Sequence, residues 1–261
     1  MSADRRARVD GLFVYPVKGL TPQPLADVPL RTGRGFPHDR EIALARPGGA
    51  YRPGLQHGIG KREFFVLVAE ARLAGIETHL DPYASRFTAR VRGHLVLDVD
   101  LAEPAGRGAL LAFWARVLDL PPGTVPVYAT DPGRRFTDTA PTSDREMHFV
   151  SLVNLASVRE FAERVGVAVD PLRFRGNVHL EGLDPWDELD LVGREFTLGG
   201  VRMRGTKPTV RCAATEVEPG TGHRDLPVPR LLRRTYGHEV MGVYAEVLGD
   251  GVLAVGGELV A

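Results

Sequence analysis

Cysteine is the residue that this 261-residue chain uses least, since Cys212 is its only one. A single thiol excludes an intrachain disulfide framework, a four-cysteine zinc site and an iron–sulfur cluster held by the chain's own thiolates. No apolar run approaches the roughly 20 residues that cross a bilayer, and the polar start is not followed by an apolar segment suited to a secretory signal. We therefore expect a protein without a membrane span, in a reducing, cytoplasmic setting.

Net charge is also absent, because 33 lysines and arginines balance 33 aspartates and glutamates. This balance argues against a general nucleic-acid binder, for which a basic domain is expected. Among the cations lysine is rare and occurs only at Lys18, Lys61 and Lys207. Lysine is a compact point charge and arginine a planar fork, so the two are not interchangeable where geometry matters. Each lysine is therefore a candidate for a specific role.

Short apolar segments between turns predict a mostly β protein of the α+β class, as a barrel or a sandwich. The expected strands cover residues 11–17, 25–30, 39–45, 64–69, 87–91, 94–100, 195–204, 213–217, 240–247 and 252–260. Helical spacing of apolar residues appears over residues 109–118, 154–165 and 226–236. The length allows two small domains, and we place their boundary between the first two helices, giving residues 1–125 and 126–261.

The segment that leads to Cys212 is strongly cationic. Residues 201–212 contain Arg202, Arg204, Lys207 and Arg211 and no acidic residue. Neighbouring cations lower the pKa of a thiol, and a thiolate is both a strong nucleophile and a soft metal ligand. The alternative is that this cysteine is a small buried hydrophobe, as many free cysteines are. The residues alone leave both interpretations open.

An ordered set of motifs then gives the chain a resemblance to a known family. The motifs are Arg173-Phe174-Arg175-Gly176-Asn177-Val178, Trp186-Asp187-Glu188-Leu189, Lys207-Pro208-Thr209-Val210-Arg211-Cys212, Glu218-Pro219-Gly220-Thr221-Gly222 and Gly242-Val243-Tyr244. Together they resemble the MOSC domain, named after the C-terminal domain of molybdenum cofactor sulfurase. Tyr15-Pro16-Val17-Lys18-Gly19 and His38-Asp39-Arg40 resemble the smaller β-barrel that precedes this domain in the mitochondrial amidoxime reducing component and its bacterial relatives.

The resemblance implies a MOSC β-barrel with a smaller N-terminal β-barrel subdomain and a few helices. It also implies a molybdenum cofactor, a molybdenum bound to a pterin, with Cys212 as the catalytic residue and the protein ligand of the metal. Charge-assisted donors suit the phosphate and pterin of such a group. By motif match the cofactor-binding residues are Lys18, Arg40, Asn154, Ser157, Arg175, Asn177 and Arg211.

Three functions remain in competition. The first is a molybdenum-dependent oxidoreductase that reduces N-hydroxylated small molecules with electrons from a separate donor protein. The second is a sulfurtransferase in which Cys212 carries a persulfide received from a cysteine desulfurase, since low-pKa thiols exchange sulfur readily. The third is a non-catalytic binding barrel with a buried cysteine. Fold alone does not choose among them.

Overall fold

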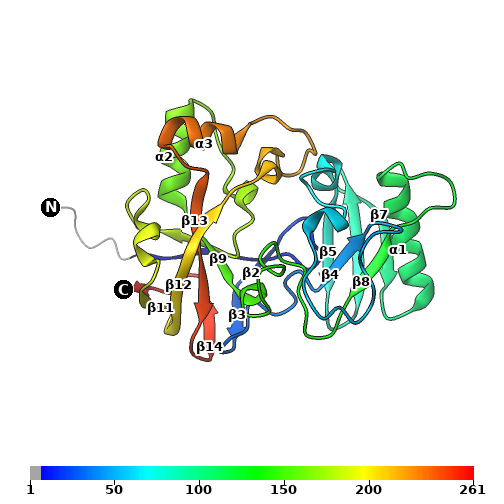
Figure 1. The fold of residues 1–261 in the computed structure, drawn as a ribbon, viewed down its shortest axis with the longest axis horizontal. Coiled ribbons are helices and arrows are strands. Elements are labelled where there is room, and N and C mark those ends of the chain that lie inside the picture. The colour runs from blue at the N-terminus through cyan, green and yellow to red at the C-terminus, as the bar shows by residue number, and fades with distance from the viewer. Residues whose placement is uncertain (1–6) are drawn as a thin grey trace.

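The computed structural model describes residues 7–261 and places them in two β-rich bodies that lie side by side (Figure 1). The larger body is built on one sheet of eight strands: β1 (Arg8–Val14), β2 (Gln23–Leu25), β9 (Val150–Asn154), β10 (Val178–Glu181), β11 (Glu195–Leu198), β12 (Val201–Val210), β13 (Val240–Val247) and β15 (Leu259–Val260). Their order across the sheet is β15-β11-β12-β13-β9-β10-β1-β2. An antiparallel pair, β3 (Asp27–Leu30) with β14 (Gly251–Ala254), lies beside this sheet.

The two ends of the large sheet meet at β1. The amide of Val9 donates to the carbonyl of Gly257 (2.9 Å), and the amide of Leu259 donates to the carbonyl of Ala7 (2.7 Å). The segment that leads into β15 therefore pairs with the start of β1, while β2 pairs with its end. The sheet closes into a barrel, and its interior is filled by fully buried apolar side chains such as Leu152 and Val243.

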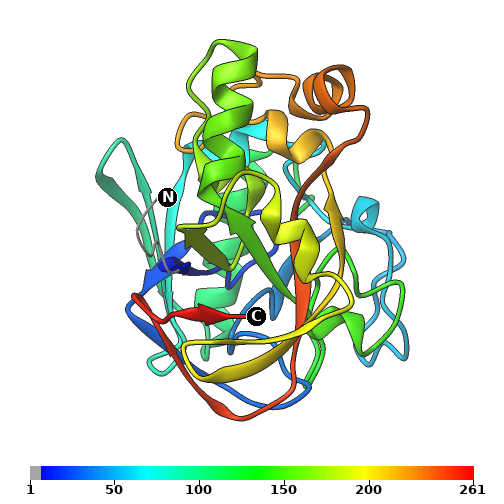
Figure 2. The same cartoon turned by 90° about the vertical axis from the view of Figure 1, so that its left-hand side faces the viewer.

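Two helices cover one end of the barrel. α2 (Leu155–Val165) connects the parallel strands β9 and β10, and α3 (Val228–Tyr236) lies next to it (Figure 2). Asn154 caps α2, because its side chain accepts a hydrogen bond from the amide of Ala156 (3.0 Å), and Gly166 ends the helix in the left-handed conformation. The structure confirms both helices that the sequence predicts here.

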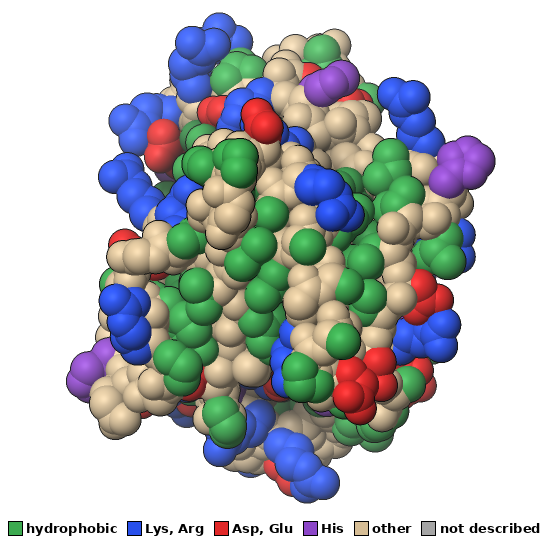
Figure 3. Space-filling view, turned by 90° about the vertical axis from the view of Figure 1, so that its right-hand side faces the viewer, with side chains coloured by type: hydrophobic (Ala, Val, Ile, Leu, Met, Phe, Trp, Pro, Cys, Tyr) green, Lys and Arg blue, Asp and Glu red, His purple; other side chains and the backbone are tan. Residues whose placement is uncertain are grey.

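The smaller body lies between β3 and β9 in sequence. It contains the pair β4 (Ile42–Ala45) and β8 (Val127–Thr130), and a sheet of β5 (Glu77–Asp81), β6 (Arg86–Val91) and β7 (His94–Asp100). α1 (Pro104–Val117) packs on β7 and inserts Trp114, which is fully buried. Figure 3 looks at this side of the molecule, where hydrophobic side chains gather across the middle and most cations lie toward the edge.

The predicted fold class, mostly β and α+β, is confirmed. Some predicted strands are wrong in detail, because glycines or changes of direction divide them. Residues 195–204 form β11 and the start of β12, joined by Gly199 and Gly200, which both have positive φ. In the same way residues 25–30 are divided between β2 and β3, and residues 252–260 between β14 and β15.

Two other predicted strands are absent from the part of the chain that the structure describes. Of residues 64–69 only the start pairs as a strand would, since Phe64 forms an isolated bridge with Ala45. The amides of Ala69 and Glu70 then both donate to the carbonyl of Val66 (2.9 Å each), so the rest of the segment is a turn. Residues 213–217 instead contain the 3-10 helix η6 (Ala213–Glu216), in which the amide of Thr215 donates to the carbonyl of Cys212 (3.0 Å). Local hydrogen bonds use the backbone groups that a strand would pair with a neighbour.

The domain boundary between residues 125 and 126 stays a prediction. The chain begins in the barrel with β1 to β3, passes through the smaller body, and returns to the barrel at β9. Within residues 7–261, no helix has the length and apolar character needed to cross a membrane.

Candidate functional site

A cavity of about 110 Å³ lies between the two bodies, close to the end of β12. Its charged lining consists of six cations and one carboxylate, namely Lys18, Arg40, Lys61, Arg173, Arg175, Arg211 and Asp138. Cys212 also lines it and is half-buried. In a chain without net charge, this gathering of cations produces a local field that favours an anionic ligand.

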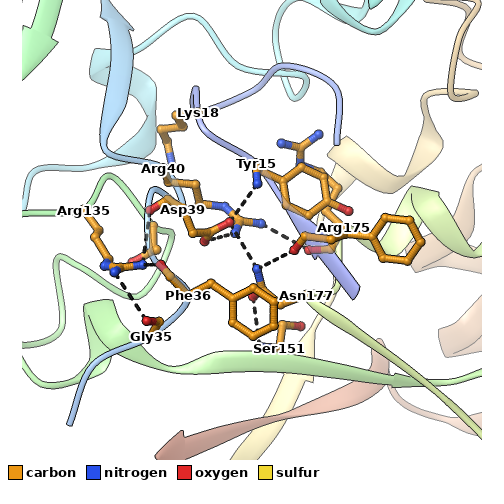
Figure 4. Close-up of polar contacts among 12 residues, drawn as sticks. Tyr15, Lys18, Gly35, Phe36, Asp39, Arg40, Arg135, Ser151, Arg175 and Asn177 are labelled. Atoms are coloured by element: carbon orange, nitrogen blue, oxygen red, sulfur yellow. Dashed lines mark hydrogen bonds and ion pairs between the residues drawn. The ribbon is translucent and has the colours of Figure 1, made fainter. Parts of the chain in front are cut away.

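Asp39 and Tyr15 hold the cationic wall together (Figure 4). The Asp39 carboxylate accepts from the amide of Tyr15 (2.9 Å) and from Nδ2 of Asn177 (3.1 Å), and it forms an ion pair with Arg40. The guanidinium carbons of Arg40 and Arg175 lie 4.6 and 4.3 Å from the centre of the Tyr15 ring. The aromatic face therefore stabilises two neighbouring cations. Burial raises the pKa of Tyr15 to about 12, so its hydroxyl stays neutral.

Arg175 keeps a buried donor free in this wall. It follows the 3-10 helix η4 (Pro171–Phe174) and has a φ of 50°, which is unusual for a residue other than glycine. Its Nη1 donates to the carbonyl of Leu20 (2.8 Å), whereas its Nη2 is buried without a partner. Burial lowers the pKa of Arg175 to about 10. Unusual backbone geometry with an unused charged donor is typical of a binding site.

Arg211 is used differently, because backbone carbonyls take its donors. Its Nε donates to Met241 (2.8 Å) and its Nη1 to Phe174 (2.6 Å). Burial lowers the pKa of Arg211 to about 10. The side chain is thus fixed in the cavity wall and supplies charge there more than free hydrogen-bond donors.

Two of the three lysines meet at Asp138. Lys18 Nζ lies 2.7 Å from one carboxylate oxygen and also donates to the carbonyl of Phe136 (2.7 Å), and Lys61 Nζ lies 3.3 Å from the other oxygen. Burial alone would raise the pKa of Asp138, but the two lysines outweigh it and hold that pKa well below the usual range. Burial would likewise lower the pKa of Lys61, yet Asp138 and Cys212 raise it. Lys61 therefore lies close enough to the thiol of Cys212 for the two groups to interact electrostatically.

Four of the nine buried side-chain polar atoms that lack a partner in the described residues belong to the lining of this cavity. Besides Arg175 Nη2, these are Arg173 Nε, Ser151 Oγ and Thr209 Oγ1. Buried polar groups in folded proteins are nearly always hydrogen-bonded. Several unused groups around one cavity indicate a place for a ligand with matching donors and acceptors.

The predicted cofactor residues Asn154 and Ser157 lie elsewhere. Both are fully buried at the start of α2, where Asn154 Nδ2 (3.0 Å) and Ser157 Oγ (2.7 Å) donate to the carboxylate of Glu188. Burial raises the pKa of Glu188 despite these bonds. The other predicted residues line the cavity: Lys18, Arg40, Arg175, Asn177, Arg211 and Cys212. Their roles toward a ligand stay predictions.

Sequence reasoning gave no site role to several residues that line the cavity or hold its wall in place. Lys61 was marked only by the rarity of lysine, and Asp39 stood in a quoted motif without an assigned role. Asp138 had no signal, because it reaches Lys18 across 120 positions of sequence. Thr209 likewise stood in a quoted motif without an assigned role, and Ser151 had no signal.

Comparison with known proteins places part of the cavity lining in a known domain. Residues 141–260 match the model of the MOSC domain family. The chain contains a MOSC domain. This domain supplies Arg173, Arg175, Arg211 and Cys212 to the cavity, and the preceding residues supply Lys18, Arg40, Lys61 and Asp138.

Two solved structures resemble the chain at low identity. YUAD protein from Bacillus subtilis is 15% identical, with 97% of this chain and 93% of that chain covered and a TM-score of 0.44. YiiM from Geobacillus stearothermophilus is 22% identical, with 42% of this chain covered and a TM-score of 0.34. That match spans about half of the YiiM chain, at 52%. No curated protein matches the chain.

Proposed function

We propose that the cationic cavity binds the molybdenum cofactor and that the chain is a molybdenum-dependent oxidoreductase. The observation that carries this proposal is the meeting of the half-buried thiol of Cys212 with six cations and several unpartnered polar atoms. A soft thiolate suits the metal, and forked guanidinium groups suit phosphate and pterin oxygens. The resemblance of the motifs to the MOSC family favours the same group.

The size of the site is compatible with such a ligand. The cationic cavity alone, at about 110 Å³, is smaller than the pockets that hold drug-sized molecules. A second pocket of about 340 Å³ adjoins it and shares Gly19, Leu67, Arg173, Arg175 and Ala214 with its lining. Together the two spaces reach the size range of ligand pockets.

In this proposal each side chain has a defined task. Cys212 provides one thiolate ligand, Lys61 and Arg211 stabilise the negative charge of that thiolate, and Arg175 offers its free Nη2 to an acceptor. Asn177 and Asp39 keep Arg40 in place. When bound, the cofactor would supply two-electron chemistry at Cys212.

The substrate class follows from the resemblance to the amidoxime reducing component. An N-hydroxylated compound would take up two electrons and two protons, lose its oxygen as water and leave the corresponding N–H compound. A single cysteine cannot hold an iron–sulfur cluster, so the electrons would come from a separate donor protein.

The decisive experiment measures molybdenum and pterin together. The protein is expressed in cells with a complete cofactor pathway and purified gently; we expect molybdenum by mass spectrometry of the metal and pterin by fluorescence after oxidation. Arg175→Ala should retain much less pterin, whereas Arg116→Ala, which alters an exposed arginine on α1, should retain the wild-type amount. Neither molybdenum nor pterin in the wild type would contradict the proposal.

A second candidate is sulfur transfer, favoured by the position of Lys61 and Arg211 around a half-buried thiol. The terminal sulfur of a desulfurase persulfide would pass to the Cys212 thiolate, and the desulfurase would keep its own thiolate. Incubation with a cysteine desulfurase should then add one sulfur atom to the mass of the wild type and none to Cys212→Ser. A non-catalytic barrel would show neither cofactor nor persulfide, and its thiol would react with labels only on unfolding.

A further inference from the structure

A second group of cations lines a separate pocket of about 360 Å³, between residues 29–41 and residues 133–148. Its volume falls in the range of pockets that hold small molecules. Among the described residues 7–261, this pocket shares no lining residue with the cationic cavity or with the pocket that adjoins that cavity. It therefore lies outside the space that the proposed function gives to the cofactor, and we call it the arginine pocket.

The charges that line the arginine pocket are unbalanced. They belong to four arginines and one carboxylate, namely Arg31, Arg34, Arg134, Arg135 and Glu41. Arg31 Nη1 lies 3.3 Å from a carboxylate oxygen of Asp250, and Arg134 Nη1 lies 3.0 Å from one of Asp144. Neither of these two aspartates lines the pocket. The charges of the other two arginines are compensated much less.

Arg135 carries a buried charge that the protein compensates weakly. It is 9% exposed, and its guanidinium donates to the backbone carbonyls of Phe36 and Gly35 (Figure 4). Its one ion pair among residues 7–261 is with Glu41, at 4.0 Å, and that carboxylate also contacts His38 (3.3 Å). Burial lowers the pKa of Arg135 despite the nearby carboxylates. An anion in the pocket would stabilise the charged guanidinium.

Arg34 is held in the pocket by a neutral partner. Its Nη1 lies 3.1 Å from Nε2 of His148, which is 8% exposed, and it forms no ion pair within the described residues. A guanidinium has donors only, so Nε2 accepts this bond and the imidazole is uncharged. Burial, with Arg135 and Arg34, lowers the pKa of His148 to about 4, which keeps the ring neutral at pH 7. The imidazole thus positions Arg34 without cancelling its charge.

We propose that the arginine pocket binds the phosphate group of a small phosphate monoester, with Arg34 and Arg135 as its binding residues and His148 as the positioning residue of Arg34. The two guanidinium groups carry two positive charges, which a phosphate dianion neutralises and a carboxylate does not. Nε and Nη2 of Arg34 make no hydrogen bond in the described chain and form a fork that suits two phosphate oxygens. A phosphate group alone does not fill the volume, and Pro29 and Pro37 also line it, so an apolar body has room beside the phosphate.

The test measures binding to the purified protein by calorimetry at low ionic strength, since salt screens exposed charges. Phenyl phosphate has both the phosphate and an apolar body, inorganic phosphate has no body, and benzoate has a single charge on a similar body. Phenyl phosphate should bind at least about tenfold more tightly than benzoate, because a charge-assisted hydrogen bond contributes a factor on the order of ten to a hundred. It should also bind more tightly than inorganic phosphate. Phenyl phosphate binding no more tightly than either of the others would overturn the proposal.

Variants locate the bound phosphate. Arg34→Ala alters an exposed residue and should weaken phenyl phosphate at least about tenfold. Arg31→Ala removes the same charge from the same loop, but that charge is already paired with Asp250, so the affinity should change by less than about threefold. Arg175→Ala, in the cationic cavity, should leave the affinity unchanged. A loss in Arg175→Ala without one in Arg34→Ala would assign the phosphate to the cofactor cavity and contradict the proposal.

His148 offers a second matched pair of variants. His148→Gln keeps a neutral acceptor for Arg34 and should retain phosphate binding. His148→Glu places a carboxylate there, compensates the charge of Arg34 and should weaken phenyl phosphate at least about tenfold. Equal binding by the two variants would contradict the positioning role, and if His148→Glu fails to fold, Arg34→Ala still decides the proposal. Because no metal is involved, these outcomes are independent of the molybdenum measurement.

Discussion

Replacing Asp39 by alanine should destabilise the protein by about 3–5 kcal/mol. The Asp39 side chain is 6% exposed and its ion-pair partner Arg40 15%, and truncating one member of a buried pair typically costs this much. The variant also removes the acceptor of Tyr15 N and of Asn177 Nδ2. The hydrogen bonds of Asp39 to Tyr15 and Asn177 connect the N-terminal segment to the MOSC domain. Losing these hydrogen bonds should loosen the wall of the cavity.

The matched variant Asp39→Asn separates the contribution of the ion pair with Arg40 from that of the hydrogen bonds to Tyr15 and Asn177. Tyr15 N and Asn177 Nδ2 both donate to Oδ1, whereas Arg40 contacts Oδ2. An asparagine can keep Oδ1 as an acceptor for Tyr15 and Asn177, but it loses the charge and places an amide donor where Arg40 contacted Oδ2. It should therefore be destabilising, but less so than alanine by about 1–3 kcal/mol. Urea unfolding followed by circular dichroism measures both free energies. A decrease in the free energy of unfolding below about 1 kcal/mol for Asp39→Ala, or equal decreases for the two variants, would refute the stabilising role given to the Asp39 carboxylate.

Two further predictions concern the core and the pH dependence. Trp114→Ala should reduce the free energy of unfolding by about 3–5 kcal/mol because the indole is fully buried, while Tyr83→Ala, at a side chain 93% exposed, should change it by less than about 0.5 kcal/mol; equal effects would contradict the packing. Burial, with Arg135 and Arg34, lowers the pKa of His148 from 6.5 to about 4, so the unfolded state binds more protons between these values and stability should fall as the pH drops through this window, by up to about 3 kcal/mol. Between pH 7 and pH 4 the free energy of unfolding should decrease less in His148→Gln than in the wild type. An equal decrease in both proteins would rule out this role of His148.

Secondary structure could be predicted well from the sequence where a periodic pattern of apolar residues is bounded by residues that begin and end a helix. α2 has its apolar face, its Asn154 cap and its Gly166 stop within one segment, so its limits could be predicted to within a residue. β13 was predicted with the limits that the structure has. By contrast β9 and β10 were missed, because they are short and are buried along almost their whole length.

The candidate site was only partly predictable, for a related reason. Motifs identified Lys18, Arg175 and Cys212, which the structure brings to one cavity. Nothing local marked Asp138 as the partner of Lys18, since ion pairs between distant segments depend on the completed packing. The strand predicted at residues 213–217 was wrong because of a local contact. Its apolar residues suit a strand, but the amide of Thr215 donates a hydrogen bond to the nearby carbonyl of Cys212.

Closure of the barrel through β1 has a consequence for synthesis on the ribosome. The strand at residues 8–14 is made long before one of its neighbours, the segment around Gly257. Pairings between residues so distant in sequence are slow to form, since the intervening chain must first be ordered. The nascent chain must therefore keep one edge of its first strand unpaired during translation, and a chaperone that shields this edge would be expected to raise the yield of folded protein.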